Sequence, residues 1–280
     1  MTASEGLGYC LPILQIEETM DDGLISRLSD ELFDALQGSH AIAPLTQRHP
    51  HIDVEAAYAV QRGLIDRRHG CGARTVGKKI GVTSKAVMNM LGVAQPDFGL
   101  LLDDMVYGEG ECLPMSRFIQ PKIEGEIAFV LKRDLQGPGI TAADVLSATE
   151  GVMACFEIVD SRIKDWKIKI QDTVADNASC GAFVLGSRLV DPRGIDLVTC
   201  GMVLEQNGEV AVTGAGAATM NSPVNAVVWL ANTLGRWGVG LGAGEVILSG
   251  ALGAMVTVRP GDTFHLRIGG IGACSVRFAA

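Results

Sequence analysis

The sequence lacks several features that mark common classes of protein. Its seven cysteines never occur with C-x-x-C spacing, and several lie in apolar segments such as MACFEIV. This distribution is typical of buried free thiols in a reducing compartment, and it argues against a disulfide framework or a zinc site. The glycine-rich segments match neither a P-loop nor a G-x-G-x-x-G fingerprint. The usual signatures of nucleotide binding are therefore missing.

Basic residues are in the minority. The chain has 23 Lys and Arg against 32 Asp and Glu, which gives a formal net charge of −9. This balance argues against nucleic acid or an anionic membrane as a partner, although a bound cation could still attract an anionic small molecule. The first residues show no basic segment ahead of an apolar run, and no stretch is long enough to cross a bilayer. We therefore expect a cytoplasmic protein without a signal peptide.

The first part of the chain, residues 1–74, carries helical patterns. Leucines recur at every fourth position over residues 24–36 and Gly38 follows, which predicts an amphipathic helix with a glycine stop. Asp53 precedes a second helical segment, which we expect to end at Gly70. The segment between the two helices is expected to be a loop.

From residue 75 to residue 280 the pattern changes to glycine-rich and β-branched segments. The pair Asn207-Gly208 between two such runs predicts a β-hairpin. Ser222 followed by Pro223 predicts the start of a helix. We find no internal repeat and no low-complexity linker. The sequence therefore predicts an α+β protein, with a small helical part (1–74) packed on a larger β-rich catalytic domain (75–280).

Two glutamates stand close together in the segment PKIEGEIAFVL. On a strand, Glu124 and Glu126 share one face with Lys122, while the apolar residues occupy the other face. A third glutamate, Glu157, lies in the apolar run MACFEIVD. Unpaired buried carboxylates cost on the order of several kcal/mol each. Three carboxylates without a nearby histidine are a ligand set for Mg²⁺ or Mn²⁺, and the alternative is that each one pairs with Arg or Lys on a solvated face.

A lysine in TVGKKIGVTS is flanked by glycines. If the segment is a strand, Lys79 shares its face with Gly77 and Gly81, which leaves open space beside the amine. Such a lysine could bind a carboxylate, act as a general acid–base group if burial or cations lower its pKa, or simply lie at the surface. Asp97 in AQPDFG and Ser179 in DTVADNASCG could each have a functional role, or their side chains could simply form hydrogen bonds with the backbone of a turn.

Four segments, in order along the chain, carry a resemblance to a known family. They are GKKIGVTSKAVMNMLGVAQPDFG, IQPKIEGEIAFVL, CFEIVDSRIKDWKIKIQDTVADNAS, and GEVILSG with the closing GGIGACSVRF. From about residue 20 onward the chain resembles the 2-hydroxypenta-2,4-dienoate hydratases of the fumarylacetoacetate hydrolase superfamily, which act in the meta-cleavage degradation of aromatic compounds. The first 18 or so residues are an unmatched extension.

The resemblance implies a fold and a set of site residues. The fold would be the superfamily's roll of mixed β-sheets with a small helical or αβ N-terminal part. The cofactor would be a divalent metal, Mg²⁺ or Mn²⁺. By role, the implied residues are the metal ligands Glu124, Glu126 and Glu157, the catalytic pair Lys79 and Asp97, and the substrate-binding Ser179.

The resemblance also implies a reaction. A carbon–oxygen lyase of this kind adds water to 2-hydroxypenta-2,4-dienoate and gives 4-hydroxy-2-oxopentanoate. The dienol would first be ketonised by protonation at C5, and water would then add at C4 with Lys79 and Asp97 moving protons. Members of the family assemble as homo-oligomers, and a complex with 4-oxalocrotonate decarboxylase or the downstream aldolase is implied as well.

Four alternatives stay open. The related 4-oxalocrotonate decarboxylase shares the metal site, so the ligands cannot separate it from a hydratase. A hydratase for a seven-carbon dicarboxylate would need an additional cationic group at the far end of the pocket. The C–C hydrolases of the superfamily use a His–Glu pair, and no histidine lies near the metal or lysine motifs. A non-catalytic partner subunit would be expected to have lost the lysine or a metal ligand, and none is missing.

Overall fold

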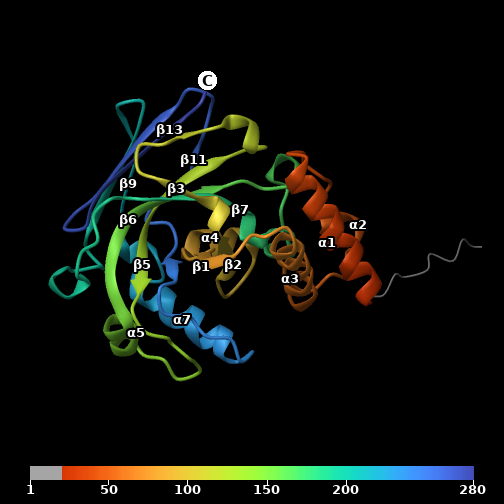
Figure 1. Cartoon of the computed structure of the whole chain (residues 1–280), viewed down its shortest axis with the longest axis horizontal. Coiled ribbons are helices and arrows are strands. Elements are labelled where there is room, and N and C mark those ends of the chain that lie inside the picture. The colour runs from red at the N-terminus through yellow and green to blue at the C-terminus, as the bar shows by residue number, and fades with distance from the viewer. Residues whose placement is uncertain (1–20) are drawn as a thin grey trace, which may run out of the picture.

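The computed structural model describes residues 21–280, in which a group of helices lies beside a β-rich body (Figure 1). The described strands form two sheets. The first has the order β2-β1-β10-β5-β6-β7-β3 with β11 paired to β5, and the second has the order β4-β13-β12-β8-β9. Both sheets contain parallel and antiparallel pairs. The predicted α+β class with mixed sheets is therefore confirmed.

The elements have the following bounds. The first sheet contains β1 (Thr75–Gly81), β2 (Asp97–Leu102), β3 (Val106–Gly108), β5 (Lys122–Leu131), β6 (Thr149–Val159), β7 (Cys180–Leu185), β10 (Val246–Leu248) and β11 (Val256–Thr257). The second contains β4 (Cys112–Leu113), β8 (Gly201–Gln206), β9 (Glu209–Ala215), β12 (Thr263–Ile268) and β13 (Gly272–Phe278). The α-helices are α1 (Asp22–Gln37), α2 (Leu45–Arg48), α3 (Val54–Gly70), α4 (Lys85–Leu91), α5 (Ala142–Ala148), α6 (Ile170–Ala175) and α7 (Pro223–Gly235).

The two predicted N-terminal helices are present, with small differences at their ends. α1 begins after Asp21 and ends before Gly38, as predicted. α3 begins after Asp53 but includes Gly70, and the left-handed residue that follows it is Gly72, with a φ of 97°. The segment between them, predicted as a loop, contains the four-residue helix α2. So short a helix has no periodic pattern by which the sequence could reveal it.

The predicted hairpin and C-terminal helix are confirmed. Asn207 and Gly208 join β8 to β9 with φ values of 55° and 85°. Two positive φ values in a row characterise the two-residue hairpin turn that favours Asn-Gly. α7 begins at Pro223 after its cap residue Ser222.

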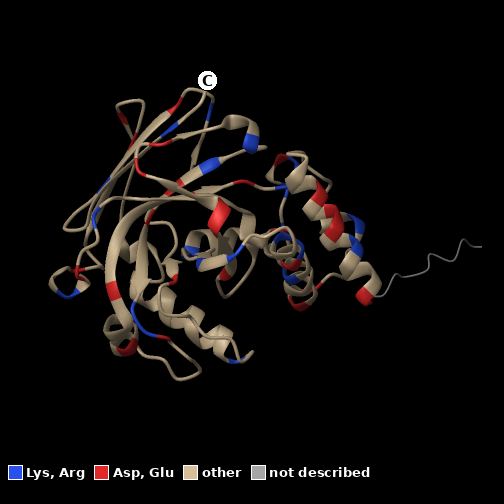
Figure 2. Cartoon of the chain, in the orientation of Figure 1, with Lys and Arg blue, Asp and Glu red and all other residues tan. Residues whose placement is uncertain are grey.

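Charges and cysteines are distributed much as the composition suggests. Figure 2 shows Lys and Arg scattered among Asp and Glu along the described chain. Within residues 21–280, no helix is both long and apolar enough to cross a bilayer. The six described cysteines are all free, but Cys71 and Cys112 are exposed, so burial holds for the other four. Cys10 and the unmatched N-terminal extension lie outside the described residues.

Strand β5 separates two apolar layers. Ile123, Ile127 and Phe129 belong to the larger core, which also includes side chains of the second sheet and of α7. Ala128, on the opposite face, belongs to a smaller core with Leu248 and residues of β6 and β7. A third core joins α1 and α3 to α6. The predicted alternation of β5 is therefore confirmed, and its acidic face points away from the larger core.

Candidate metal centre and active site

The pairing of β5 with β6 brings the three glutamates together. Glu124 lies directly opposite Glu157 in the antiparallel register, and Glu126 lies two residues further along the same face. Each residue offers one carboxylate oxygen, and these oxygens lie within 4.8 Å of one another. Glu126 and Glu157 are fully buried, whereas Glu124 is half-buried. The cluster is therefore closed on one side and accessible near Glu124.

The oxygens of this cluster are poorly satisfied by the protein. Among the described residues, Glu126 Oε1 and both carboxylate oxygens of Glu157 are buried without a hydrogen-bond partner. Glu126 Oε2 accepts a hydrogen bond from Gly250 N at 2.7 Å. Native proteins rarely leave buried carboxylate oxygens unpaired, because the desolvation penalty is large. A set of hard, acceptor-only oxygens of this kind fits a divalent cation of the magnesium type.

The electrostatics of the cluster agree with this fit. Burial raises the pKa of Glu124 to about 7, and the charge of Glu157 adds to the effect. Burial also raises the pKa of Glu126 well above its ordinary value, again with a contribution from Glu157. The burial of the three carboxylates and their close approach thus hold the pKa values of Glu124 and Glu126 above the ordinary range in the absence of a cation.

Lys79 lies on the same face of the sheet as the glutamates. Strand β10 stands between β1 and β5, and its Leu248 is in register with Lys79 on one side and Ala128 on the other. Lys79 Nζ lies 3.2 Å from Glu157 Oε1, within ion-pair distance though not aligned for a hydrogen bond. The same nitrogen donates to Ala178 O at 3.0 Å. The lysine is 3% exposed, so the surface alternative is wrong.

The charge state of Lys79 differs from the one that a lone buried lysine would have. Burial acts to lower the pKa of its amine, but the carboxylates of Glu157 and Asp97 outweigh burial and raise it above the ordinary value. The sequence analysis considered that burial or cations could lower the pKa of the Lys79 amine. With the described residues alone, this lowering is not found. Lys79 is an ammonium group, which makes it a proton donor.

The two glycines beside Lys79 have different roles. A Cβ on Gly81 would lie 2.2 Å from Asp97 Oδ1 and 3.0 Å from Lys79 Nζ, so this glycine leaves room for both groups. A Cβ on Gly77 would lie 1.9 Å from Val246 O. Gly77 therefore permits the close approach of β10 and does not open space beside the amine. The sequence interpretation is right for Gly81 and wrong for Gly77.

Asp97 lies at the start of β2, in register with Gly81. It is 2% exposed, and its Oδ1 has no hydrogen-bond partner among the described residues. Burial raises the pKa of Asp97 to about 6, although the nearby Lys79 acts in the opposite direction. The carboxyl also lines a cavity of about 230 Å³. Asp97 is thus a strand residue next to Lys79 rather than the cap of a turn.

Ser179 belongs to a strained turn between α6 and β7. Asn177, Ala178 and Ser179 have φ values of 54°, 50° and 54°, which are costly for residues other than glycine. The Asn177 side chain holds the turn to β2, accepting from Leu100 N at 2.8 Å and donating to Leu100 O at 2.9 Å. Ser179 Oγ is buried, 3.1 Å from Thr173 Oγ1. The turn thereby presents the Ala178 carbonyl to Lys79.

Three residues at this site escaped the sequence analysis. Asn177 acts through a long-range contact for which the sequence carries no signal. Tyr58 lines the cavity beside Asp97 and stacks on Phe98, with ring centroids 4.6 Å apart. Ser249 follows β10 and is fully buried, and its Oγ has no partner among the described residues. A hydroxyl in the apolar run VILSG is the same kind of signal that identified Glu157, so Ser249 could have been found.

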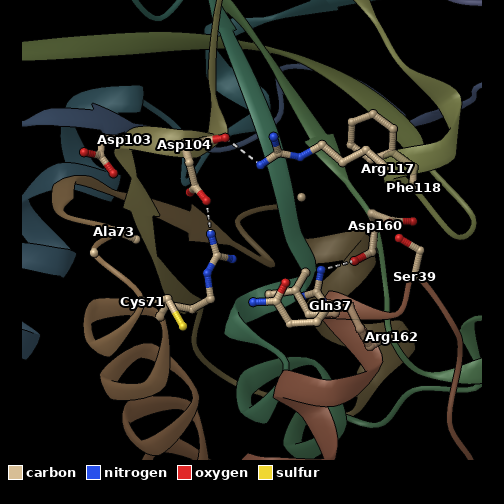
Figure 3. Close-up of a pocket in the computed structure, with 14 residues that line it drawn as sticks. Gln37, Ser39, Cys71, Ala73, Asp103, Asp104, Arg117, Phe118, Asp160 and Arg162 are labelled. Atoms are coloured by element: carbon tan, nitrogen blue, oxygen red, sulfur yellow. Dashed lines mark hydrogen bonds and ion pairs between the residues drawn. The ribbon is translucent and has the colours of Figure 1, made fainter.

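A larger cavity, of about 650 Å³, lies elsewhere in the described structure (Figure 3). Its walls are charged but largely paired: Arg68 forms an ion pair with Asp104, and Arg117 donates to Asp104 O. Arg162 donates to Asp160 O at 2.6 Å. The glutamate cluster and Lys79 do not line this cavity. Space alone therefore does not identify the site, whereas the unsatisfied oxygens do.

Comparison with known proteins gives consistent results. The family described as "Fumarylacetoacetate (FAA) hydrolase C-terminal" matches residues 73–279. A 2-hydroxypent-2,4-dienoate hydratase of Pseudomonas putida is 62% identical over 221 residues, covering 79% of this chain and 100% of that protein. A 2-hydroxyhexa-2,4-dienoate hydratase of Comamonas testosteroni is 52% identical over 260 residues, which cover 92% of this chain and 98% of that protein.

A solved structure is also closely similar. It is a 4-oxalocrotonate decarboxylase from Pseudomonas putida G7 in complex with magnesium and adipate. The TM-score is 0.90 at 38% identity, with 93% of this chain and 99% of that chain covered. The two polypeptides therefore share their fold over nearly their whole length.

Proposed function

Since the chain belongs to the fumarylacetoacetate hydrolase family, we propose that it is a carbon–oxygen lyase, a hydratase that adds water to 2-hydroxypenta-2,4-dienoate. The product is 4-hydroxy-2-oxopentanoate, formed in the meta-cleavage degradation of aromatic compounds. The observation that carries the proposal is the cluster of three glutamates with unpartnered oxygens and a buried lysine beside them. The names of relatives at 62% and 52% identity support a hydratase.

A divalent cation is the cofactor, and magnesium or manganese is the proposed ion. The magnesium in the related decarboxylase structure supports this choice. Glu124, Glu126 and Glu157 would hold the ion, since they supply the unsatisfied oxygens. When bound, such a cation acts as a Lewis acid that stabilises negative charge on the 2-oxygen of the substrate.

The lysine and the aspartate move the protons. Lys79 is an ammonium held in place by Ala178 O and Glu157, and it delivers a proton to C5 of the dienol. Asp97 has an unpartnered Oδ1 and a pKa of about 6, raised mainly by burial, which suits a group that takes a proton from water near neutral pH. Water adds at C4 and C3 gains a proton, which balances the proton that the enol oxygen loses on ketonisation. Asp97 then passes the proton taken from water to Lys79, so both groups return to their starting states. Ser179 contacts the substrate.

Further properties belong to the same proposal. The enzyme is a homo-oligomer, and it forms a complex with 4-oxalocrotonate decarboxylase or with the downstream aldolase. It works in the cytoplasm, which the free state of the six described cysteines supports. The division of the chain at residue 74 belongs to the proposal too: residues 21–74 are the described portion of the helical part, and residues 75–280 form the catalytic domain.

The deciding experiment follows the dienol absorbance with purified protein. The absorbance should fall when Mg²⁺ or Mn²⁺ is present and should stay constant when a chelator is added first. The product should be 4-hydroxy-2-oxopentanoate, identified by chromatography. Turnover that is unaffected by the chelator would remove the metal from the proposal, and no turnover with either ion would remove the hydratase assignment.

The decarboxylase is the second candidate, favoured by the TM-score of 0.90 with the solved decarboxylase. Both activities need the same metal ligands, so the ligands do not separate them. Incubation with 4-oxalocrotonate would separate them, because a decarboxylase releases CO₂ from it. The hydratase proposal predicts water addition to the monocarboxylate and no CO₂ release above the uncatalysed rate.

A further inference from the structure

One cation beside the glutamate cluster has no part in the proposed reaction. Lys122 is the first residue of β5 and lies on the same face as Glu124, two residues away. Positions two apart on a strand are separated by roughly 7 Å. Glu126 lies on the other side of Glu124, so Lys122 stands at the accessible end of the cluster, where Glu124 is half-buried. Burial raises the pKa of Glu124 and the charges of Lys79 and Lys122 act in the opposite direction, so the charge of Lys122 reaches the cluster.

The ammonium of Lys122 is held by an aromatic ring and not by a carboxylate. Its Nζ lies 4.3 Å from the centroid of the Trp166 ring, which is the geometry of a cation–π interaction. Among residues 21–280, no carboxylate lies within ion-pair distance of this nitrogen. Asp165, next to Trp166, pairs with Lys167 at 3.3 Å. Because an ammonium group has three N–H donors and the ring covers one side, Lys122 can still donate to an anion.

Trp166 is fixed in place by the turn between β6 and α6. Asp165 and Trp166 have φ values of 58° and 54°, which are costly for residues other than glycine. Gln120 holds this turn, because its Nε2 donates to Ser161 O at 2.8 Å and to Ile163 O at 2.6 Å. Trp166 Nε1 in turn donates to Gln120 O at 3.0 Å. The ring therefore has a set position over the ammonium, two residues along the chain from Gln120.

The charges of the metal-loaded site would attract an anion only with Lys122 included. A divalent cation and the Lys79 ammonium together balance the three glutamates, and the Asp97 carboxyl adds a negative charge whenever it is ionised. Without Lys122 the site would therefore be neutral or negative. With Lys122 it is positive or neutral, which suits a ligand that carries one carboxylate.

We propose that Lys122 binds the carboxylate group of the substrate at the open side of the glutamate cluster, and that Trp166 holds the ammonium in position for this contact. The inference rests on the proposed function, since it places the 2-oxo acid end of the substrate at the cluster. The two lysines then have separate roles, because they come from different strands, β5 and β1. Lys122 binds the anion, whereas Lys79 delivers the proton.

The first test measures the binding of an unreactive 2-oxo acid to the full-length protein by calorimetry, with Mg²⁺ at saturation. The ligand is 2-oxopentanoate, which has no double bond to hydrate, and its methyl ester is the neutral counterpart. Lys122→Gln should raise the Kd for the acid by about 10- to 100-fold and leave the Kd for the ester unchanged. Lys122→Arg keeps the charge and should stay within about fivefold of the wild type.

A metal titration without the 2-oxo acid separates this role from support of the metal ligands. Lys122 places a positive charge beside Glu124, so Lys122→Gln should bind Mg²⁺ about two- to tenfold more tightly than the wild type. The matched control Lys132→Gln removes an exposed lysine just beyond the other end of β5, where it pairs with Glu150 at 3.7 Å. This control should change neither the metal Kd nor the Kd for the acid. Weaker metal binding in Lys122→Gln would show that the lysine supports the ligands and would overturn the proposal.

Steady-state kinetics provide a second readout. Lys122→Gln should raise KM for 2-hydroxypenta-2,4-dienoate by at least about tenfold and lower kcat by less than about tenfold, because binding and not proton transfer is impaired. Trp166→Leu removes the ring and should raise KM by about three- to tenfold. Trp166→Phe keeps a ring and should raise KM less. Circular dichroism of all variants checks that a loss does not reflect unfolding.

The possible failures can be told apart. If the metal-loaded wild type does not hydrate the dienoate, the proposed function fails, and the calorimetry still decides on Lys122. If the wild type hydrates the dienoate but Lys122→Gln binds 2-oxopentanoate as tightly, the inference fails while the hydratase assignment stands. Equal losses for the acid and the ester would also overturn the inference, as would a wild type that does not bind 2-oxopentanoate.

Discussion

Two groups of buried charges lie close together in the chain and differ in how the protein satisfies them. Asp176 accepts hydrogen bonds from Arg162 Nε, from Arg162 N at 2.9 Å and from Ser161 Oγ at 3.3 Å. The remaining donors of Arg162 reach the carbonyls of Asp160, Cys180 and Asp176. Glu157, by contrast, accepts no hydrogen bond among the described residues and lies beside two further carboxylates.

This difference distinguishes a buried ion pair that stabilises the fold from a cluster of charged groups that can bind a ligand. The Arg162–Asp176 pair is complete within the chain, and it ties the end of β6 to α6 and β7. The glutamate cluster is only partly compensated among the described residues, because the one ammonium of Lys79 faces three carboxylates, so a further positive charge from outside would stabilise it. A buried charged group whose donors are all supplied by the fold stabilises that fold, and one whose donors are missing marks a binding site.

The largest effect is expected from breaking the complete pair. Arg162→Met leaves the Asp176 carboxylate buried without its partner, so the free energy of unfolding should fall by about 3–5 kcal/mol. Glu126→Gln in the metal-free protein replaces a buried carboxyl whose pKa burial already raises well above its ordinary value, so it should leave stability unchanged or raise it. Denaturant unfolding of both variants measures the contrast. Equal losses in the two variants would contradict the distinction between the two groups.

The next effect concerns turnover. Lys79→Ala should reduce kcat by about 10²- to 10⁴-fold while metal binding persists, because the proton donor is lost but the three ligands remain. Lys78→Ala is the matched control, since Lys78 pairs with Glu245 at 2.6 Å on the opposite face of β1. Steady-state kinetics and metal titration measure the two quantities. A near-normal kcat in Lys79→Ala would remove this residue from the mechanism.

A smaller effect is expected on metal affinity. Glu157→Gln replaces one charged ligand by a neutral one, so the metal concentration needed for half-maximal activity should rise by about 10- to 100-fold. Glu150→Gln, at an exposed position of the same strand, is the control and should not change it. If both variants need the same metal concentration as the wild type, Glu157 is not a ligand.

The smallest effect is a pH dependence of the metal-free protein. Burial raises the pKa of Glu124 from 4.5 to about 7, so the folded state binds more protons than the unfolded state between these values. The free energy of unfolding should therefore fall as the pH rises from about 4.5 to 7, by about 1–2 kcal/mol. Adding Mg²⁺ should remove this decline, because the cation favours the charged carboxylates. Stability that rises with pH in the chelated protein would contradict the assigned pKa.

The sequence predicted the features that depend on neighbours in the chain. The alternation of β5 placed Glu124 and Glu126 on one face, and the Asn207-Gly208 turn followed from backbone preferences alone. The role of Gly77 was misjudged because the contact with Val246 O lies far away in the chain. Asn177 and the Arg162–Asp176 pair were not found for the same reason, since their partners are set by tertiary packing.

The pairing of β5 with β6 has a consequence for how this chain can change over time. Glu124 and Glu157 face each other only in the present register, and side chains alternate between faces at every position. If one residue were inserted into either strand, a glutamate of the cluster would point into the apolar core that the first sheet shares with the second sheet. Within the segment from β5 to β6, insertions and deletions are therefore tolerated only in the connection 132–148. The lengths of the two strands themselves must stay constant.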